Sequence, residues 1–367
     1  MKLYLAIILS VIALSSAHLT WSHENDHEYS FSDYEVQFSK KYADEQEHEI
    51  RKFIYTKNVE KIRKINKDST MTWKAGINHL TDRTNVEINA LKGYNRPLRF
   101  ATRKMTFPTE KTDEIVDLPD SVDWRTKGVV NAIRNQGGCG SCWAFSTVAV
   151  MESHIAIQTG KLLEMSEQQL VDCTPNPQHC GGTGGCKGAT QELGFDYYHK
   201  TGGANAGSAY KYTARDGACK DSASPKIATI EGYNQLPTND YDALMTAVAT
   251  KGPVSVSVSA DAWFFYDSGI FNGECGATID HAVVAVGYGA DAKGNLFWII
   301  RNSWGERWGE NGHIRLSREK SAKDVKCEID YNPGAGSGCE GGPSQIKVCG
   351  QCGVLSDSSL PFGGKLV

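Results

Sequence analysis

Three residue types that together support nucleophilic acyl transfer, a cysteine, a histidine and an asparagine, occur at well-separated points of the chain. Cys142 ends the run Gln-Gly-Gly-Cys-Gly-Ser-Cys at 136–142, and the residues after it are apolar nearly all round, which predicts a buried helix over 142–158. A thiol in the first turn of such a helix meets unpaired backbone N–H groups and the positive end of the helix dipole. The sequence therefore predicts that Cys142 is a nucleophile with a lowered pKa.

A thiolate needs a proton carrier, and His281 supplies an imidazole at the start of an apolar run that predicts a strand. Asn302 follows another such run, and its amide can accept the imidazole N–H without adding negative charge beside a thiolate and imidazolium pair. Trp304 would exclude water from that hydrogen bond. Gln136 can place a side-chain N–H beside the backbone N–H of Cys142, which predicts an oxyanion hole.

Cysteine usage indicates the compartment. Residues 3–14 form a short apolar segment, and small residues follow at Ser15 and Ala17, which predicts a secretory signal at residues 1–17, cleaved after Ala17. In an oxidising compartment, ten of the eleven cysteines can close five disulfides and one remains. The alternative that Cys142 is one more disulfide partner stays open at this point.

Composition excludes several classes of protein. The chain has 367 residues, of which 40% are hydrophobic and 22% charged, so intrinsic disorder, collagen and coiled coil are excluded. A formal net charge of -4 provides no global basic field for nucleic acid or an anionic membrane. No stretch besides the signal approaches the roughly 20 apolar residues of a membrane span, so none is predicted.

The remaining chain divides into two unlike parts. Residues 18–117 contain no cysteine and show a helical period, whereas all eleven cysteines lie in 118–367. Prolines at 97, 108 and 119 indicate a linker over 93–120. In the second part, a helical half (about 118–230) precedes a half with the alternation of β-strands (231–367).

Helix and strand patterns support this division. Tyr34, Phe38 and Tyr42 recur every four residues and predict one helix, and Glu47 with Arg51 forms an i, i+4 pair on another. Three further signals are a capping box of Ser166 and Gln169, a C-cap at Gly160, and strands at 254–258, 282–286, 296–300 and 313–316.

Taken together, these motifs resemble the papain-like cysteine peptidases of the cathepsin L-like branch. The similarity covers essentially the whole chain. Leu118 to Arg125 looks like a mature N-terminus of that family, and two propeptide motifs are matched by Glu47, Arg51, Tyr55, Asn58, Ile62 and Asn66, and by Gly76, Asn78 and Asp82.

The resemblance implies an α+β, papain-like two-domain fold, with a helical left domain, a β-barrel-like right domain, an active-site cleft between them and a helical propeptide before them. It implies a cysteine endopeptidase made as a zymogen, with Gln136, Cys142, His281 and Asn302 as catalytic residues and no metal or cofactor. The implied partners are protein and peptide substrates, with the chain's own propeptide as an intramolecular inhibitor. The protein would be a monomer in the secretory pathway, either in a lysosome-like acidic vacuole or extracellular.

The same resemblance proposes three disulfides, which are Cys139 with Cys186, Cys173 with Cys219, and Cys275 with Cys352. Four cysteines fall outside the usual set, and three pairings are possible among Cys180, Cys327, Cys339 and Cys349. Their region, about 318–351, is longer than the family's turn before the last strand, and the sequence assigns it no function.

The resemblance also places a substrate pocket beside the nucleophile. The substrate backbone would lie on the loop at 186–189, and Asp357 at the base of the pocket could bind an Arg side chain through a charge-assisted pair. The alternative is that Asp357 is solvated or turned away. The residues expected to bind substrate are Gly188, Ala189, Thr190, Gln191, Ser257, Ile279, Ala282, Asp357 and Trp304.

Two rival functions are compatible with parts of the sequence. Cys139 with Cys142, and Cys349 with Cys352, are C-x-x-C motifs of the kind found in thiol oxidoreductases and zinc proteins. Neither role requires the glutamine, histidine and asparagine described above. A noncatalytic binding protein on the same fold would normally lack the nucleophile or the histidine, and both are present here.

Overall fold

The computed structural model describes residues 18–93 and 117–367. The expected signal at 1–17 and most of the expected linker lie outside the described residues. The helices are α1 (Phe31–Gln37), α2 (Glu45–Lys67), α3 (Asn85–Asn89), α4 (Cys142–Thr159), α5 (Glu167–Cys173), α6 (Gln191–Thr201) and α7 (Tyr241–Thr250). None of the helices in the described ranges is long and apolar enough to cross a bilayer.

The main sheet follows the order β1-β7-β10-β9-β8-β6-β13-β5, and β2 pairs with β8. Within the described residues this path is open, with β1 and β5 at its ends, so the expected barrel is not closed. The strands are β1 (Trp73–Ala75), β2 (Val122–Asp123), β5 (Gly232–Gln235), β6 (Val254–Val258), β7 (Tyr266–Phe271), β8 (His281–Ala290), β9 (Leu296–Arg301), β10 (His313–Ser317) and β13 (Ser358–Phe362). Two small sheets contain β3 (Ala204–Asn205), β4 (Lys226–Thr229) and β14 (Lys365–Leu366), and β11 (Cys327–Asp330) and β12 (Ile346–Cys349).

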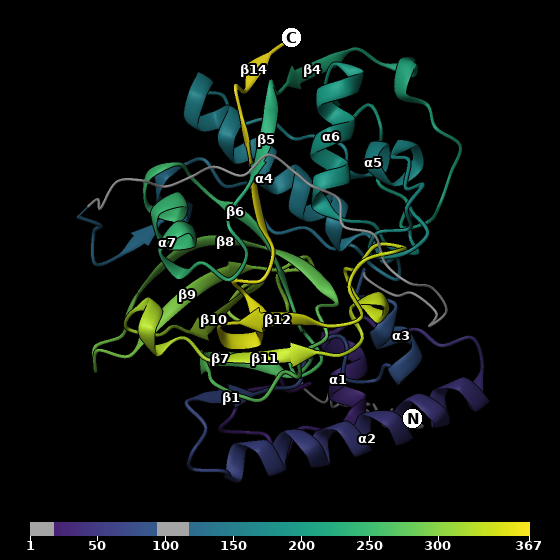
Figure 1. Ribbon diagram of the computed structural model, residues 1–367. Helices are drawn as coiled ribbons and strands as arrows, with labels where there is room; N and C mark the ends of the chain where they lie inside the picture. The colour runs from purple at the N-terminus through teal and green to yellow at the C-terminus, as the bar shows by residue number, and fades with distance from the viewer. Residues whose placement is uncertain (1–17, 94–116) are drawn as a thin grey trace, which may run out of the picture.

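The helical half and the sheet half lie against each other along α4, in the centre of Figure 1. Helix α4 packs on α6 and α5 on one side and on β8 on the other. Its residues are apolar nearly all round because both sides are covered, and it ends at Gly160, whose φ of 73° is the left-handed conformation that glycine adopts easily. The helix and the C-cap expected from the sequence are confirmed, as is the Ser166 cap of α5.

The N-terminal part forms a separate layer under the sheet, drawn in purple and blue in Figure 1. Strand β1 extends the main sheet by pairing antiparallel with β7, and Asn78 Nδ2 donates to the Phe264 carbonyl at 2.7 Å. The expected pair of Glu47 and Arg51 is present at 3.1 Å, and Arg51 also contacts Glu87 at 2.6 Å. This part of the chain is therefore held to the sheet half by backbone pairing and by buried polar contacts.

The first helix is shorter than its period suggests. Helix α1 ends at Gln37, and Ser39 has a φ of 52°, so the chain turns before Tyr42. The expectation that Tyr34, Phe38 and Tyr42 share one helix is wrong. Their side chains still converge, because Tyr34 and Tyr42 both donate hydrogen bonds to the Asp82 carboxylate, at 2.9 and 3.0 Å.

Five disulfides connect the C-terminal part, and all eleven cysteines lie within the described residues. Three of the disulfides have the pairing that the resemblance proposed. Of the three pairings that the sequence left open for the other four cysteines, the structure has Cys180 with Cys339 and Cys327 with Cys349. The first three are Cys139–Cys186, Cys173–Cys219 and Cys275–Cys352.

Candidate active site

Cys142 is the first residue of α4 and the one free cysteine of the chain. Its thiol is fully buried between the helical half and β8, where the backbone N–H of Ala282 donates to Sγ at 3.3 Å. Strand β8 begins at His281, so Ala282, which contacts the thiol, is the next residue after the histidine. The helix start and the strand start are thus joined at the same point.

His281 and Asn302 come together because β8 and β9 are neighbouring antiparallel strands. His281 Nε2 lies 2.8 Å from Asn302 Oδ1, which also accepts the backbone N–H of Ser303 at 2.8 Å. The indole of Trp304 stacks on the imidazole, with ring centroids 4.9 Å apart, and Trp304 is only 1% exposed. Among the described residues the other ring nitrogen, Nδ1, has no hydrogen-bond partner.

Gln136 is oriented from the β half. The Ser303 hydroxyl donates to Gln136 Oε1 at 2.6 Å, and the Gln136 backbone N–H donates to the Ser303 carbonyl at 2.9 Å. With its oxygen held in this way, the amide directs Nε2 toward the carbonyls of Cys139 and Leu91, at 2.9 and 2.8 Å. The amide donor of Gln136 is therefore fixed in place before any substrate arrives.

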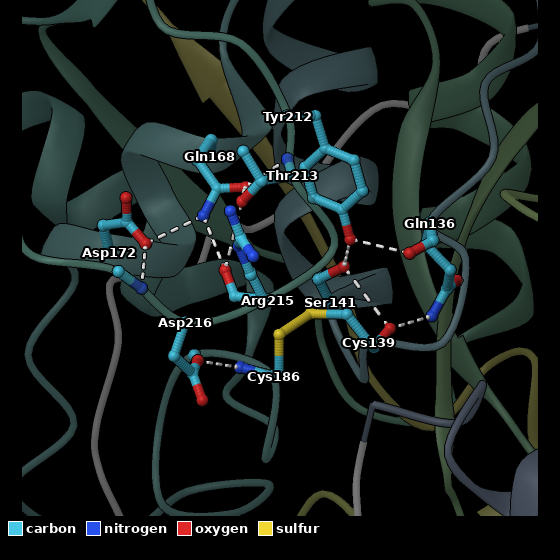
Figure 2. Close-up of a disulfide and its surroundings, with 12 residues drawn as sticks. Gln136, Cys139, Ser141, Gln168, Asp172, Cys186, Tyr212, Thr213, Arg215 and Asp216 are labelled. Atoms are coloured by element: carbon cyan, nitrogen blue, oxygen red, sulfur yellow. Dashed lines mark hydrogen bonds between the residues drawn. A yellow bond between two sulfur atoms is a disulfide. The ribbon is translucent and has the colours of Figure 1, made fainter.

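A tyrosine hydroxyl connects Gln136 with the start of α4, as Figure 2 shows. Tyr212 Oη donates to the Gln136 carbonyl at 2.7 Å and lies 2.6 Å from Ser141 Oγ. Ser141 is the N-cap residue of α4, and the Cys139–Cys186 disulfide closes the loop from the other side. Tyr212 thus ties the two residues that flank the loop before Cys142.

Residues 91–93 of the N-terminal part lie in this site. The Gly93 backbone N–H donates to Cys142 Sγ at 3.2 Å, and the Leu91 carbonyl accepts the Gln136 amide. Gly188 is in direct contact with this segment, since a Cβ on Gly188 would stand 1.9 Å from the Gly93 oxygen. The turn at residues 91–93 therefore occupies the surface between the thiol and the loop at 186–189.

Lys92 fastens the same segment by charge. Its ammonium group lies 2.9 Å from Asp280 Oδ2 and also contacts the carboxylate of Asp261. Burial raises the pKa of Asp280 to about 6, and Lys92 opposes this rise. Asp280 directly precedes His281, so the anchor of Lys92 and the imidazole belong to one short stretch of chain.

The protonation of the site differs from the expectation. Burial raises the pKa of the Cys142 thiol to about 12 and lowers that of His281 to about 4, despite the hydrogen bond that the imidazole makes to Asn302 Oδ1. In this state the lowered thiol pKa expected from the helix N-terminus is not found, because burial outweighs the hydrogen bonds that the backbone N–H groups of Ala282 and Gly93 donate to the sulfur. Burial thus favours the neutral forms of both the thiol and the imidazole in this state.

Three of the residues expected to bind substrate, Gln191, Ser257 and Asp357, are in contact. Asp357 accepts hydrogen bonds from Ser257 Oγ at 2.8 Å and from Gln191 Nε2 at 3.1 Å, and its second oxygen accepts one from Gln235 Nε2 at 2.8 Å. Asp357 is half-buried. The other residues expected here are buried, namely Gly188, Ala189, Thr190, Ile279 and Ala282.

A second carboxyl group lies behind Asp357. Glu192 is 2% exposed and accepts the Ser359 hydroxyl at 2.7 Å, and burial, followed by the charge of Asp357, raises its pKa to about 8. The sequence reading missed Glu192, Gln235, Ser303 and Tyr212, because each reaches the site through tertiary contacts and carries no local motif. It also did not single out residues 91–93, of which only Gly93 belongs to the stretch read as a linker, 93–120.

The two C-x-x-C motifs do not act as dithiols. Cys139 is bonded to Cys186 while Cys142 is free, and Cys349 and Cys352 belong to different disulfides, with Cys327 and Cys275. Neither motif therefore presents the paired thiols that a redox or zinc site needs.

Two families of known proteins match this chain. The papain family cysteine protease domain matches residues 118–337, and the cathepsin propeptide inhibitor domain (I29) matches residues 31–88. The chain is a papain-family cysteine protease. Its N-terminal layer, including α1, α2 and β1, belongs to the propeptide domain of this protease, so the expected family, enzyme class and proenzyme organisation are confirmed.

Named relatives of this protease support the same conclusion. It is 39% identical over 337 residues to the senescence-specific cysteine protease SAG39 of Oryza sativa subsp. japonica, which covers 90% of this chain and 97% of the relative. It is 40% identical over 285 residues to cathepsin S of Mus musculus, covering 76% and 82% of the two chains. Both relatives span the greater part of their own length in the match.

Solved proenzyme structures share the fold. The recombinant stem bromelain precursor matches with a TM-score of 0.74 and 35% identity, covering 90% of this chain and 97% of that one. The digestive procathepsin L2 of Tenebrio molitor larval midgut matches with a TM-score of 0.74 and 30% identity, covering 90% and 98%. The papain-like α+β fold with a propeptide is thus confirmed.

Proposed function

We propose that this cysteine protease cleaves peptide bonds through an acyl-enzyme on Cys142, with His281 as acid and base. Cys142 gives its thiol proton to His281 Nδ1, and the resulting thiolate attacks the scissile carbonyl carbon, while the oxyanion accepts hydrogen bonds from Gln136 Nε2 and the Cys142 backbone N–H. His281 gives its Nδ1 proton to the leaving amine, and the C–N bond breaks to leave a thioester. A water molecule then loses a proton to His281 and attacks the thioester, which releases the acid and the thiol.

One observation carries this proposal. A peptide carbonyl, that of Leu91, already accepts the Gln136 amide at 2.8 Å, while the next-but-one backbone N–H donates to Cys142 Sγ at 3.2 Å. A peptide bond therefore fits between the thiol and the amide donor. The unpaired Nδ1 of His281 and the hydrogen bond from Nε2 to Asn302 leave the imidazole one nitrogen for proton transfer.

The propeptide would inhibit by lying in the reverse direction. In a substrate, the residues that precede the scissile carbonyl would lie on the loop at 186–189. In the proenzyme, Gly93 follows the Leu91 carbonyl and contacts Gly188. The reversed chain places no scissile carbonyl carbon against a charged nucleophile, and the thiol beneath it is protonated, since burial raises its pKa to about 12.

The pocket ending at Asp357 would select the side chain two positions before the scissile bond. Three side-chain donors hold the Asp357 carboxylate, and Glu192 behind it is neutral in acid because its pKa is raised to about 8. We therefore expect the pocket to accept Arg as well as bulky apolar residues such as Phe.

The remaining assignments follow from the sequence pattern. We assign residues 1–17 to a signal peptide, 18–117 to the inhibitory propeptide and 118–367 to the peptidase domain. The chain would act as a monomeric endopeptidase, since the stretch 173–186 holds no long insertion. It would travel the secretory pathway to an acidic vacuole or to the extracellular space, where acid releases the propeptide.

The test is acid activation of the purified proenzyme followed by a thiol-directed peptide reagent, with the adduct located by mass spectrometry. An adduct on Cys142 is expected, and Cys142→Ser should abolish proteolysis while the circular dichroism spectrum is unchanged. His281→Ala should also abolish activity, whereas the matched control His199→Ala, on the exposed end of α6, should not. Proteolysis retained by Cys142→Ser or by His281→Ala would contradict the proposal.

A further inference from the structure

The region that the sequence left without a function forms a strap between the two halves of the protease. Strands β11 and β12 pair antiparallel from Cys327 and Cys349 to Asp330 and Ile346, and the Cys327–Cys349 disulfide closes the base of this hairpin. Residues 332–340, the strap, leave the hairpin on the sheet side and reach the helical half, as the yellow segment at the centre right of Figure 1 shows.

In the helical half, the strap is held covalently and by backbone contacts. Cys339 is bonded to Cys180, and the neighbouring Gly181 N–H donates to the Gly338 carbonyl at 3.1 Å. The Glu340 N–H donates to the Gln178 carbonyl at 2.8 Å. These bonds attach the strap to the loop that leads directly into 186–189.

In the sheet half, the strap contacts a residue of the proposed pocket. The Ser337 N–H donates to the Ile279 carbonyl at 2.9 Å, and a Cβ on Gly336 would stand 2.1 Å from the same oxygen. Ile279 lies two residues before His281 and is 1% exposed. The glycine at 336 is therefore required for the strap to approach the pocket wall this closely.

These contacts place the strap beside the bound peptide. Consecutive residues, Ser337 and Gly338, hold Ile279 of the sheet half and Gly181 of the helical half. Gly188 lies against the carbonyl oxygens of both Gly181 and Gly93. A Cβ added to Gly188 would stand 2.2 Å from the Gly181 oxygen and 1.9 Å from the Gly93 oxygen. Gly181 thus lies between the strap and the loop at 186–189, and it contacts both.

We propose that the strap is a specificity-determining wall, which bounds the cleft just beyond the pocket and favours small side chains three positions before the scissile bond. The inference rests on the proposed function, which defines that end of the cleft. Backbone atoms line this wall at Gly336–Gly338, and the Cys180–Cys339 disulfide prevents the two halves from moving apart to admit a larger group. A bulky side chain at this position would have to displace covalently anchored backbone.

The test is a panel of fluorogenic tripeptides X-Phe-Arg, with X as Gly, Ala, Leu or Trp, cleaved by the activated protease. For the wild-type enzyme, kcat/KM should be about tenfold higher for Gly than for Trp at X, the discrimination typical of steric rejection. In Cys180→Ser/Cys339→Ser, the ratio should fall to about threefold or less. The matched control is Cys173→Ser/Cys219→Ser, which opens a disulfide of the helical half and should keep the wild-type ratio.

Each outcome bears on the proposal. Equal rates across X in the wild-type enzyme would overturn it, even if the double variant fails to fold, because that measurement needs no variant. An unchanged ratio in a folded Cys180→Ser/Cys339→Ser enzyme would overturn it as well. Labelling of Cys142 and cleavage of Phe-Arg substrates would still stand in both cases, so failure of the strap is distinguishable from failure of the catalytic assignment.

Discussion

The side-chain amide of Gln136 donates to the carbonyl of Leu91 at 2.8 Å, so the donor proposed for the oxyanion is occupied by the propeptide. Ser303 holds the other end of this amide through its hydroxyl, at 2.6 Å. One side chain would therefore serve two states of the protease. In the proenzyme it binds the propeptide, and in the released enzyme we propose that it faces the substrate carbonyl.

Gln136→Ala should lower kcat of the activated enzyme by about 100 to 1,000-fold, since removing one oxyanion donor typically costs that much. KM should change little, because the donor acts mainly in the transition state. Steady-state kinetics check this expectation, and Ser303→Ala should give a smaller loss of the same kind. A Gln136→Ala enzyme with normal kcat would remove the amide from the mechanism.

Lys92→Met should allow activation under milder acid. Burial raises the pKa of Asp280 to about 6, so the carboxylate that holds Lys92 is charged above pH 6 and neutral below it. The ion pair of Lys92 with Asp280 contributes at neutral pH and is lost as the pH falls through 6, while the contact of Lys92 with Asp261 is a second attachment. The rate of propeptide release, followed by gel electrophoresis from pH 4 to 7, should be faster in Lys92→Met, and its ratio to the wild-type rate should be larger at pH 7 than at pH 4.

The control for this experiment is Lys57→Met, which removes an exposed lysine of α2 and should leave the pH profile unchanged. A profile for Lys92→Met that coincides with wild type at every pH would show that the ion pair does not hold the propeptide.

Alkylation of Cys142 should be slow in the proenzyme and fast after activation. At a thiol pKa of about 12, only about one molecule in 10⁵ carries the thiolate at pH 7, and Sγ is also fully buried. Release of residues 91–93 admits water and leaves the helix N-terminus to stabilise the charge. Iodoacetamide labelling with mass spectrometry measures both rates, and rapid labelling of the intact proenzyme would contradict the expectation.

Asp357→Ala should change substrate preference without impairing the chemistry. The ratio of kcat/KM for Arg-Arg over Phe-Arg substrates should fall roughly tenfold or more, as a charge-assisted pair is lost. Glu192→Gln should keep the ratio in acid, where the raised pKa leaves Glu192 neutral. An unchanged ratio in Asp357→Ala would mean that the carboxylate does not meet the substrate.

Tyr212→Phe should reduce stability and activity together. Its hydroxyl donates to the Gln136 carbonyl and contacts Ser141 Oγ, so the variant leaves buried partners unsatisfied, at about 1 to 3 kcal/mol of unfolding free energy. Thermal denaturation and kcat check this. The matched control Tyr210→Phe loses its hydrogen bond to Asp172 and should lower stability while leaving kcat unchanged.

The sequence predicted the elements that carry a strong local pattern of apolar residues. The helix over 142–158, apolar nearly all round, and the strand over 254–258 correspond to α4 and β6, which are buried along most of their length. The motif around Cys142 also indicated the nucleophile. A free cysteine at the start of a helix is uncommon in a chain whose other cysteines form disulfides.

What the sequence did not predict depends on contacts between distant segments. Helix α1 ends at Gln37 because the chain turns at Ser39, and this turn lets Lys40 reach Asp82 at 2.6 Å. The spacing of apolar residues in the sequence carries no information about that contact. The raised pKa of Cys142 arises from burial between the two halves of the protease, which no local pattern of residues reports. The pairing of Cys180 with Cys339 required the position of the strap, 159 residues further along the chain.

Besides covering the active site, the propeptide covers an edge of the main sheet through strand β1. It covers β7, which is otherwise the last strand on that side of the main sheet. Once the propeptide departs, the N–H and C=O groups of β7 are open to any extended chain, including another copy of the enzyme. Within β7, the charged residue Asp267 and the positive φ of 93° at Gly269 are features that we expect to disfavour pairing with another chain.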